Sequence, residues 1–126
     1  KRYQALNSPI ILPVHRFSKE ELTLISELSL LDYGLTIKNG ELTSYKTHSV
    51  VPSDITTAYV LAILLESNLL SLKAVGLDGY DINDPRQQEM INILDLYAMH
   101  KASSELESLT PTSYPLVKGS IYAPNC

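Results

Sequence analysis

The sequence has little cysteine, no long hydrophobic run and no cluster of basic residues. Its one cysteine, Cys126, is the last of 126 residues, which excludes an intramolecular disulfide and a thiolate zinc site. The longest apolar run, residues 58–65, is too short to cross a bilayer. Ten Lys and Arg stand against fourteen Asp and Glu, and the cations are scattered. We therefore expect no membrane partner and no nucleic-acid partner, and a cytoplasmic location by default.

The motifs of several kinds of catalytic site are also missing. There is no Gly-x-Ser-x-Gly elbow for a nucleophile, no Gly-x-Gly-x-x-Gly and no Walker lysine for phosphates. His15, His48 and His100 are far apart and none is spaced with a second metal ligand. We expect no catalytic residues, no metal and no cofactor in this chain. Because it opens on Lys1-Arg2-Tyr3 without a targeting pattern, we expect a C-terminal fragment of a longer protein.

What the sequence does contain predicts one α/β domain. We expect three layers: a mostly parallel sheet of four or five strands, flanking helices and one β-hairpin. Strands are predicted at residues 9–14 and 106–109, with an edge strand at 116–117 or 121–122. The apolar run at 72–77 is predicted to be a central strand.

Three helix starts are predicted from capping residues. Ser18 and Glu21 form a capping box for a helix that begins at Lys19 and buries Leu22, Ile25 and Leu28 or Leu30. Ser53 or Asp54 is predicted to cap a helix that runs to about residue 67 and is apolar nearly all round, hence buried on most sides. Asp84-Pro85 predicts a helix to about residue 102, with Met90, Ile91, Ile93, Leu94 and Tyr97 buried and Arg86, Gln87 and Gln88 in water.

The hairpin is predicted from Gly34 to Tyr45. Asn39-Gly40 lies between two alternating segments, and this dipeptide tolerates positive φ at both central positions of a type I′ turn.

Two loops are candidates for ligand binding. Asp78, Gly79, Tyr80 and Asp81 follow the predicted central strand, and ligands of open α/β sheets bind at the carboxyl ends of strands. The alternative is that turn and capping chemistry already accounts for most of these residue types.

The second loop, residues 109–115, carries the hydroxyls of Thr110 and Thr112 and would lie beside the first if the two strands are neighbours. Turn formation explains its residue types equally well. His15 follows the first strand and is predicted to share the same edge, with a solvated loop as the alternative.

Four segments in order resemble a known family: the small-residue helix at 56–62, the strand that ends in GLDGY at 76–80, the helix start at 84–90, and SLTPTSY at 108–114. Together they resemble the C-terminal domain that follows the barrel in HMG-CoA-lyase-like aldolases of bacterial surface-polysaccharide loci. The resemblance covers residues from about 54 to 122. It implies an accessory domain that follows an aldolase-like barrel in the same chain. The Asp and His-x-His metal ligands of that barrel are absent from this sequence, so the resemblance does not imply aldol cleavage by this chain.

Two other functions stay open. The segment from Ala58 to Asp78 is also similar to bacterial sialyltransferases and the pterin diphosphokinase-like fold, which implies a transferase-like module that binds a nucleotide or a sugar. The third alternative is a protein-interaction domain that uses an exposed edge strand near Ile121.

Overall fold

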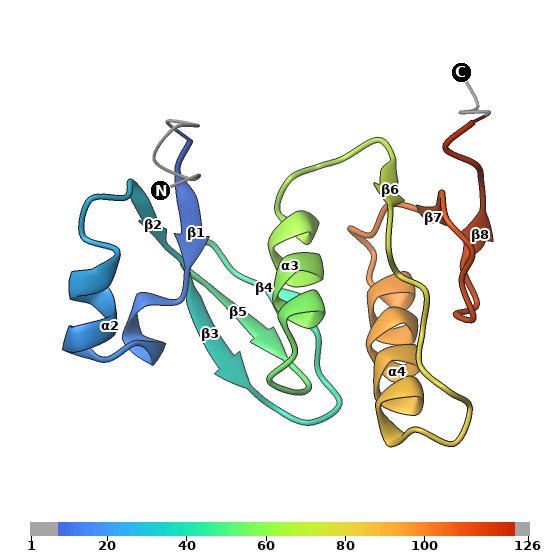
Figure 1. Cartoon of the computed structure of the whole chain (residues 1–126), viewed down its shortest axis with the longest axis horizontal. Helices are drawn as coiled ribbons and strands as arrows, with labels where there is room; N and C mark the ends of the chain where they lie inside the picture. Colours follow the sequence, from blue (N-terminus) through green and yellow to red (C-terminus); the bar gives the residue numbers. More distant parts are fainter. Residues whose placement is uncertain (1–7, 123–126) are drawn as a thin grey trace.

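The chain folds as an α/β protein with short strands and flanking helices (Figure 1). The computed structural model describes residues 8–122. Cys126, singled out above, and the three opening residues lie outside this range. The strands are β1 (Ile10–Leu12), β2 (Leu30–Asp32), β3 (Gly34–Ile37), β4 (Thr43–Ser44), β5 (His48–Val51), β6 (Leu72–Ala74), β7 (Leu106–Ser108) and β8 (Val117–Lys118). The helices are the 3₁₀-helix η1 (Val14–Arg16) and the α-helices α2 (Lys19–Leu24), α3 (Thr56–Leu65) and α4 (Pro85–Met99).

In the first half of the chain, two parallel strand pairs meet at Tyr33. β2 pairs in parallel with β1, and β3 pairs in parallel with β5. Only Tyr33 separates β2 from β3. Its amide donates to Leu12 O on the β1 side (3.1 Å), whereas the next amide, that of Gly34, donates to Thr47 O on the β5 side (2.9 Å). Residues 30–37 therefore act as one strand with a partner on each edge. The prediction of one sheet with four or five strands is not met, because the strands of the described residues are divided among three sheets.

The second half builds a separate parallel sheet in the order β6-β7-β8. Helix α4 connects β6 to β7 by the crossover that parallel strands require. Helix α3 packs on β5 and β4 and also contacts α4. One hydrophobic core joins both halves, because buried residues from β3, β5, α3, α4 and β7 belong to a single cluster. The predicted α/β class, with mostly parallel pairing and flanking helices, is confirmed.

Two of the predicted helix starts are confirmed in atomic detail. Ser18 Oγ accepts from the Glu21 amide (3.2 Å), and the Glu21 carboxylate accepts from the Ser18 amide (2.8 Å). Asp84 caps α4 by accepting from the Arg86 amide, with Pro85 in the first helical position. Local sequence decided these starts because each bond joins residues within one helical turn.

The predicted hairpin is wrong. β3 and β4 do not pair with each other; each pairs with β5, which lies between them. The turn itself forms, since the Glu41 amide donates to Lys38 O (3.2 Å), but only Gly40 has positive φ (76°) and Asn39 does not. One positive φ at the third turn residue is the type II pattern. The twist of that turn splays its flanking strands instead of closing them into a ladder.

The third predicted helix start is also wrong, by one or two residues. The N-cap of α3 is Ile55, with no side-chain cap. The Asp54 carboxylate instead forms an ion pair with the Arg16 guanidinium (2.7 Å). The Ser53 hydroxyl oxygen is buried and has no hydrogen-bond partner in the described part of the chain.

Two further predictions need correction. β6 is not central: it is an edge strand of its sheet, and β7, with Ser108 fully buried, lies in the middle. Apolar residues suggested a central strand, but the segment leaves strand geometry after Ala74, and Val75 is exposed.

α2 ends at Leu24 and buries no residue completely, so the expected stripe is only half-buried.

Of the two positions predicted for the last strand, the first is confirmed. The strand is β8 at Val117–Lys118, and residues 121–122 form a turn beyond it.

Candidate functional site

The two predicted loops, residues 76–84 and 109–115, lie against each other. They follow β6 and β7, which are parallel neighbours, so both loops leave the sheet at the same rim. The Ser113 amide donates to Asp78 O (2.8 Å), and the Gly76 amide donates to Thr110 Oγ1 (2.9 Å). The prediction that these loops meet is confirmed, although β6 lies at the edge of the sheet.

One buried glutamine connects the two loops, although the sequence predicted that this residue is exposed to water. Gln87, on the first turn of α4, is only 8% exposed. Its Oε1 accepts from the Tyr80 amide (2.8 Å), and its Nε2 donates to Ser113 Oγ (3.1 Å). A buried amide is tolerated where its hydrogen bonds are made. Its spacing of three and seven residues from Met90 and Leu94 puts it on the buried stripe of α4, a signal that could have found it.

Gly79 is required where the loops touch. Its φ is +101°, and a Cβ built on it would lie 1.8 Å from Ser113 Oγ. Both the backbone conformation and the close approach therefore exclude a side chain here.

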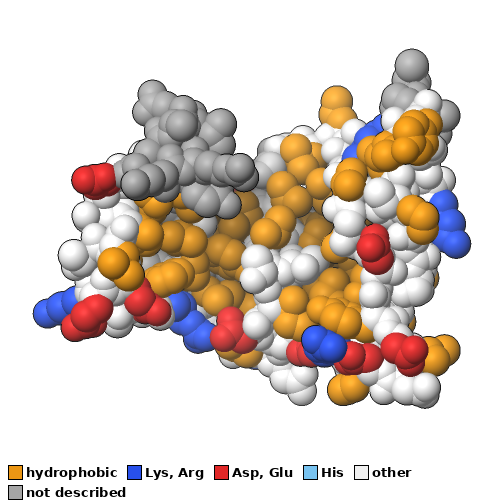
Figure 2. All heavy atoms as spheres, in the orientation of Figure 1, with side chains coloured by type: hydrophobic (Ala, Val, Ile, Leu, Met, Phe, Trp, Pro, Cys, Tyr) orange, Lys and Arg blue, Asp and Glu red, His pale blue; other side chains and the backbone are white. Residues whose placement is uncertain are grey.

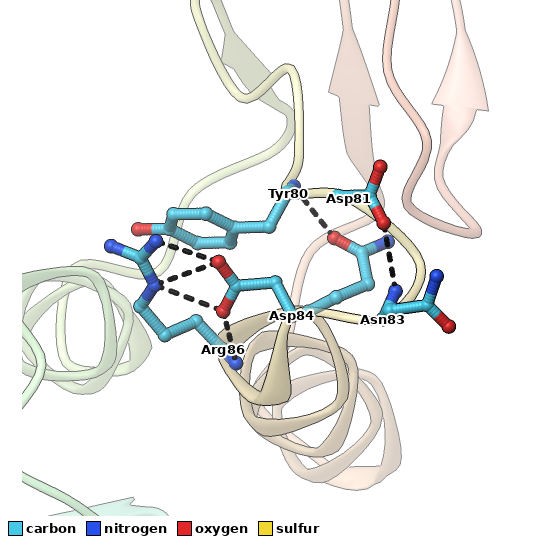
Figure 3. A network of polar contacts seen from close by, with 6 residues as sticks. Tyr80, Asp81, Asn83, Asp84 and Arg86 are labelled. Atoms are coloured by element: carbon cyan, nitrogen blue, oxygen red, sulfur yellow. Dashed lines mark hydrogen bonds and ion pairs between the residues drawn. The ribbon is translucent and has the colours of Figure 1, made fainter.

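Beside this contact, an ion pair fixes the aromatic ring of Tyr80 (Figure 3). The Arg86 guanidinium donates to both carboxylate oxygens of Asp84 at 2.6–3.2 Å. The same guanidinium lies over the Tyr80 ring, 4.4 Å from its centroid. Hydrogen bonds from the Arg86 side chain and amide lower the pKa of Asp84 to about 2.

The low pKa of Asp84 predicts an acid-sensitive helix start. Because the folded pKa lies below the unfolded value of about 3.9, the carboxylate stabilises the fold fully above about pH 4, and this contribution is lost as pH falls through about 2. Asp84→Ala should lower the melting temperature at neutral pH, and the gap to the unmodified chain should narrow below pH 4. Asp95→Ala, an exposed change on the same helix, serves as the control. A gap that stays constant between neutral pH and pH 2 would contradict the assignment.

Most polar groups of the loops are used to build the loops themselves. Asp81 accepts from the Asn83 amide (3.0 Å), Thr112 Oγ1 accepts from the Tyr114 amide (3.1 Å), and Thr110 accepts from Gly76. The Asp78 carboxylate differs, because it is exposed and makes no hydrogen bond or ion pair with the described residues.

His15 does not belong to this site, contrary to the prediction of a shared edge. It lies in η1, where its Nε2 is 3.1 Å from the carbonyl oxygen of Leu35 on β3. β1 and β6 belong to different sheets, so the ends of these strands are not at one rim (Figure 1).

A cavity of about 400 Å³ opens beside the loop pair. The loops contribute Gly76, Leu77, Asp78, Gly79, Tyr80 and Tyr114, and the remaining walls are Ile55 and Thr57 from the start of α3 and Met90 from α4. Among residues 8–122, no lysine or arginine lines it.

A second feature of the surface is apolar and follows α3. A groove of about 720 Å³, here the α3–β1 groove, separates α3 from β1 and η1, with walls that include Ile11, Leu12, Phe17 and Ile63. A smaller groove of about 270 Å³, the α3–β6 groove, lies between α3 and β6. Figure 2 shows hydrophobic side chains gathered in the hollow of this face.

Thr56, Val60 and Leu64 line both grooves. They are spaced four residues apart on α3 and form one row along the helix, here called the α3 ridge. Sequence reasoning predicted that this helix is buried on most sides, and the ridge is the side that stays uncovered: Val60 is 44% exposed.

Comparisons with protein-family models, curated proteins and solved structures find no match to this chain. Among residues 8–122, no group of three or more His, Cys, Asp and Glu side chains is placed to hold a metal ion. Within the same range, no helix combines the length and the apolar character that a membrane span needs.

Proposed function

We propose that this chain is an accessory domain that docks against a helix of a neighbouring folded domain through the α3 ridge. The observation that carries the proposal is the exposure of one side of a helix whose sequence is apolar nearly all round. Such helices are buried in stable assemblies. A ridge with a groove on each side is also the surface that one helix offers to another in ridges-into-grooves packing.

The charges around the grooves favour an apolar and neutral partner surface. Arg16, at the rim of the α3–β1 groove, is paired with Asp54 at 2.7 Å. Lys73, in the wall of the α3–β6 groove, lies 3.6 Å from Glu107. With both cations paired, the described residues of the two grooves offer no free positive charge to an acidic peptide, a nucleic acid or an anionic lipid.

The resemblance described above supplies the identity of the neighbour that we propose. An aldolase-like barrel in the same polypeptide would present outer helices, because barrels of alternating strands and helices are surrounded by them. The chain would then position or complete the enzyme and leave the chemistry to the barrel.

Site-specific photocrosslinking in the full-length polypeptide tests this proposal. A benzophenone amino acid at position 60, on the α3 ridge, should crosslink to a helix of an aldolase-like barrel in the same polypeptide. The same probe at position 24 is the matched control, because Leu24 is 86% exposed on α2 and lines neither groove.

Three outcomes would overturn the proposal. They are a crosslink from position 60 to a second copy of the α3 ridge, a crosslink to nucleic acid or lipid, or no more product from position 60 than from position 24. A further variant, Val60→Glu, should weaken the docking that Leu24→Glu leaves intact, because it places a charge in the apolar contact.

A further inference from the structure

The cavity beside the loop pair adjoins the two grooves, because it shares Ile55 with the α3–β1 groove and Thr57 and Leu77 with the α3–β6 groove. It has the features of a small-molecule site. Polar groups converge on it from separate elements: Thr57 from α3, Asp78 and Tyr80 from the first loop, and Tyr114 from the second. A concave site with a few fixed polar groups and an apolar floor, here Leu77 and Met90, is the usual form of a ligand pocket.

The walls of this cavity are held in place before any ligand arrives. Gln87 fixes both loops from behind, and the Asp78 carbonyl is tied to the Ser113 amide. The Tyr80 ring is held by the Arg86 guanidinium (Figure 3). The loop backbone and the Tyr80 ring, held by these contacts, lose little conformational entropy on binding, which favours recognition by a preformed site.

The charge of the cavity selects among ligand classes. The Asp78 carboxylate has no partner among the described residues, and the Arg86 guanidinium at the start of α4 is bound to Asp84 and does not line the cavity. A phosphate would therefore meet a negative charge with no cation to offset it, which disfavours nucleotides and sugar phosphates. Hydroxyl groups would instead donate to the carboxylate and to the Thr57 and tyrosine oxygens.

We propose that this cavity binds a neutral polyhydroxylated ligand of the size of a monosaccharide, with Asp78 accepting hydrogen bonds from its hydroxyls. The ring of Tyr80, which is 41% exposed, supplies flat apolar surface for the carbon face of a sugar ring. Of the two ligands that the sequence left open, a nucleotide and a sugar, this proposal keeps the sugar.

Amide chemical-shift mapping of the whole chain tests the assignment, with D-glucose, D-galactose, D-mannose and N-acetyl-D-glucosamine as separate probes. At least one sugar should shift the amides of residues 76–80 and 112–114 and of Thr57 in a saturable way. Asp78→Asn should weaken that binding by about tenfold or more, because hydrogen bonds to a charged acceptor are among the stronger ones. Glu20→Gln, an exposed change of the same charge on α2, should leave it unchanged.

Retained amide dispersion in the Asp78→Asn spectrum separates loss of the ligand from loss of the fold. The assignment is overturned if none of the four sugars shifts the loop amides, or if Asp78→Asn and Glu20→Gln bind equally. It is also overturned if inorganic phosphate or AMP binds the same loops more tightly than the sugars do.

Discussion

Ile93→Ala is expected to lower the free energy of unfolding by about 2–5 kcal/mol, the range for deleting a large aliphatic side chain from a core that cannot collapse around the cavity. Ile93 is 1% exposed and lies in the middle of α4. The cluster that includes it joins residues of β3 and β5 to Leu106 of β7, so the cavity would weaken contacts on both sides of the helix. Since small domains are stable by only about 5–15 kcal/mol, the loss is a large fraction of the total.

Chemical denaturation followed by circular dichroism measures this loss. Met99→Ala is the matched control, because Met99 is on the same helix but 82% exposed, and we expect a change within about 0.5 kcal/mol. A single unfolding transition in both variants would agree with one core. An Ile93→Ala transition that splits in two would mean that the halves of the chain unfold separately.

Gly79→Ala is expected to destabilise the chain by about 3 kcal/mol and to separate the two loops. A residue with a side chain at φ +101° is strained by about 1–3 kcal/mol, and forcing a methyl group into a filled space costs a similar amount. The new Cβ would meet Ser113 Oγ, which Gln87 holds in place, so the contact cannot be relieved without breaking that hydrogen bond.

Gly76→Ala isolates the effect of the contact. Gly76 also has positive φ (80°), but a Cβ there meets nothing within 4 Å, so we expect only the backbone strain of about 1–2 kcal/mol. Denaturation gives the two stabilities, and the amide shifts of Tyr80 and Ser113 report the loop contact directly. Equal effects of the two substitutions would show that the approach of the loops matters little.

The features that sequence predicted well are those fixed by neighbouring residues. The capping box at Ser18 and the Asp84-Pro85 start each depend on bonds within one turn, so their residue types were sufficient. The meeting of the two loops was predicted from the strand-end rule, and it held because β6 and β7 are parallel neighbours.

The features that failed depend on partners far away in the sequence. Asn39-Gly40 makes a turn, but both flanking strands pair with β5 instead of with each other, so no hairpin forms. The sequence offers Asp54 as an N-cap of α3. In the structure its carboxylate accepts a hydrogen bond from Arg16, thirty-eight residues earlier in the chain. Gln87 was assigned to solvent from its polarity, although the helical spacing put it on the buried side, where Tyr80 and Ser113 supply its hydrogen bonds.

The strand at residues 30–37 has partners of unequal burial on its two edges. η1 and α2 contain no buried residue and β1 is at most half-buried, whereas Ser49, Val50 and Val51 of β5 are buried. Regions with few buried contacts open locally without global unfolding. Amide protons of Ile10 and Tyr33 should therefore exchange with deuterium faster than those of Gly34 and Lys38. Because β1 and η1 form one wall of the α3–β1 groove and α3 forms the other, we expect the β1 wall to move more readily than the α3 wall when a partner's side chain enters the groove.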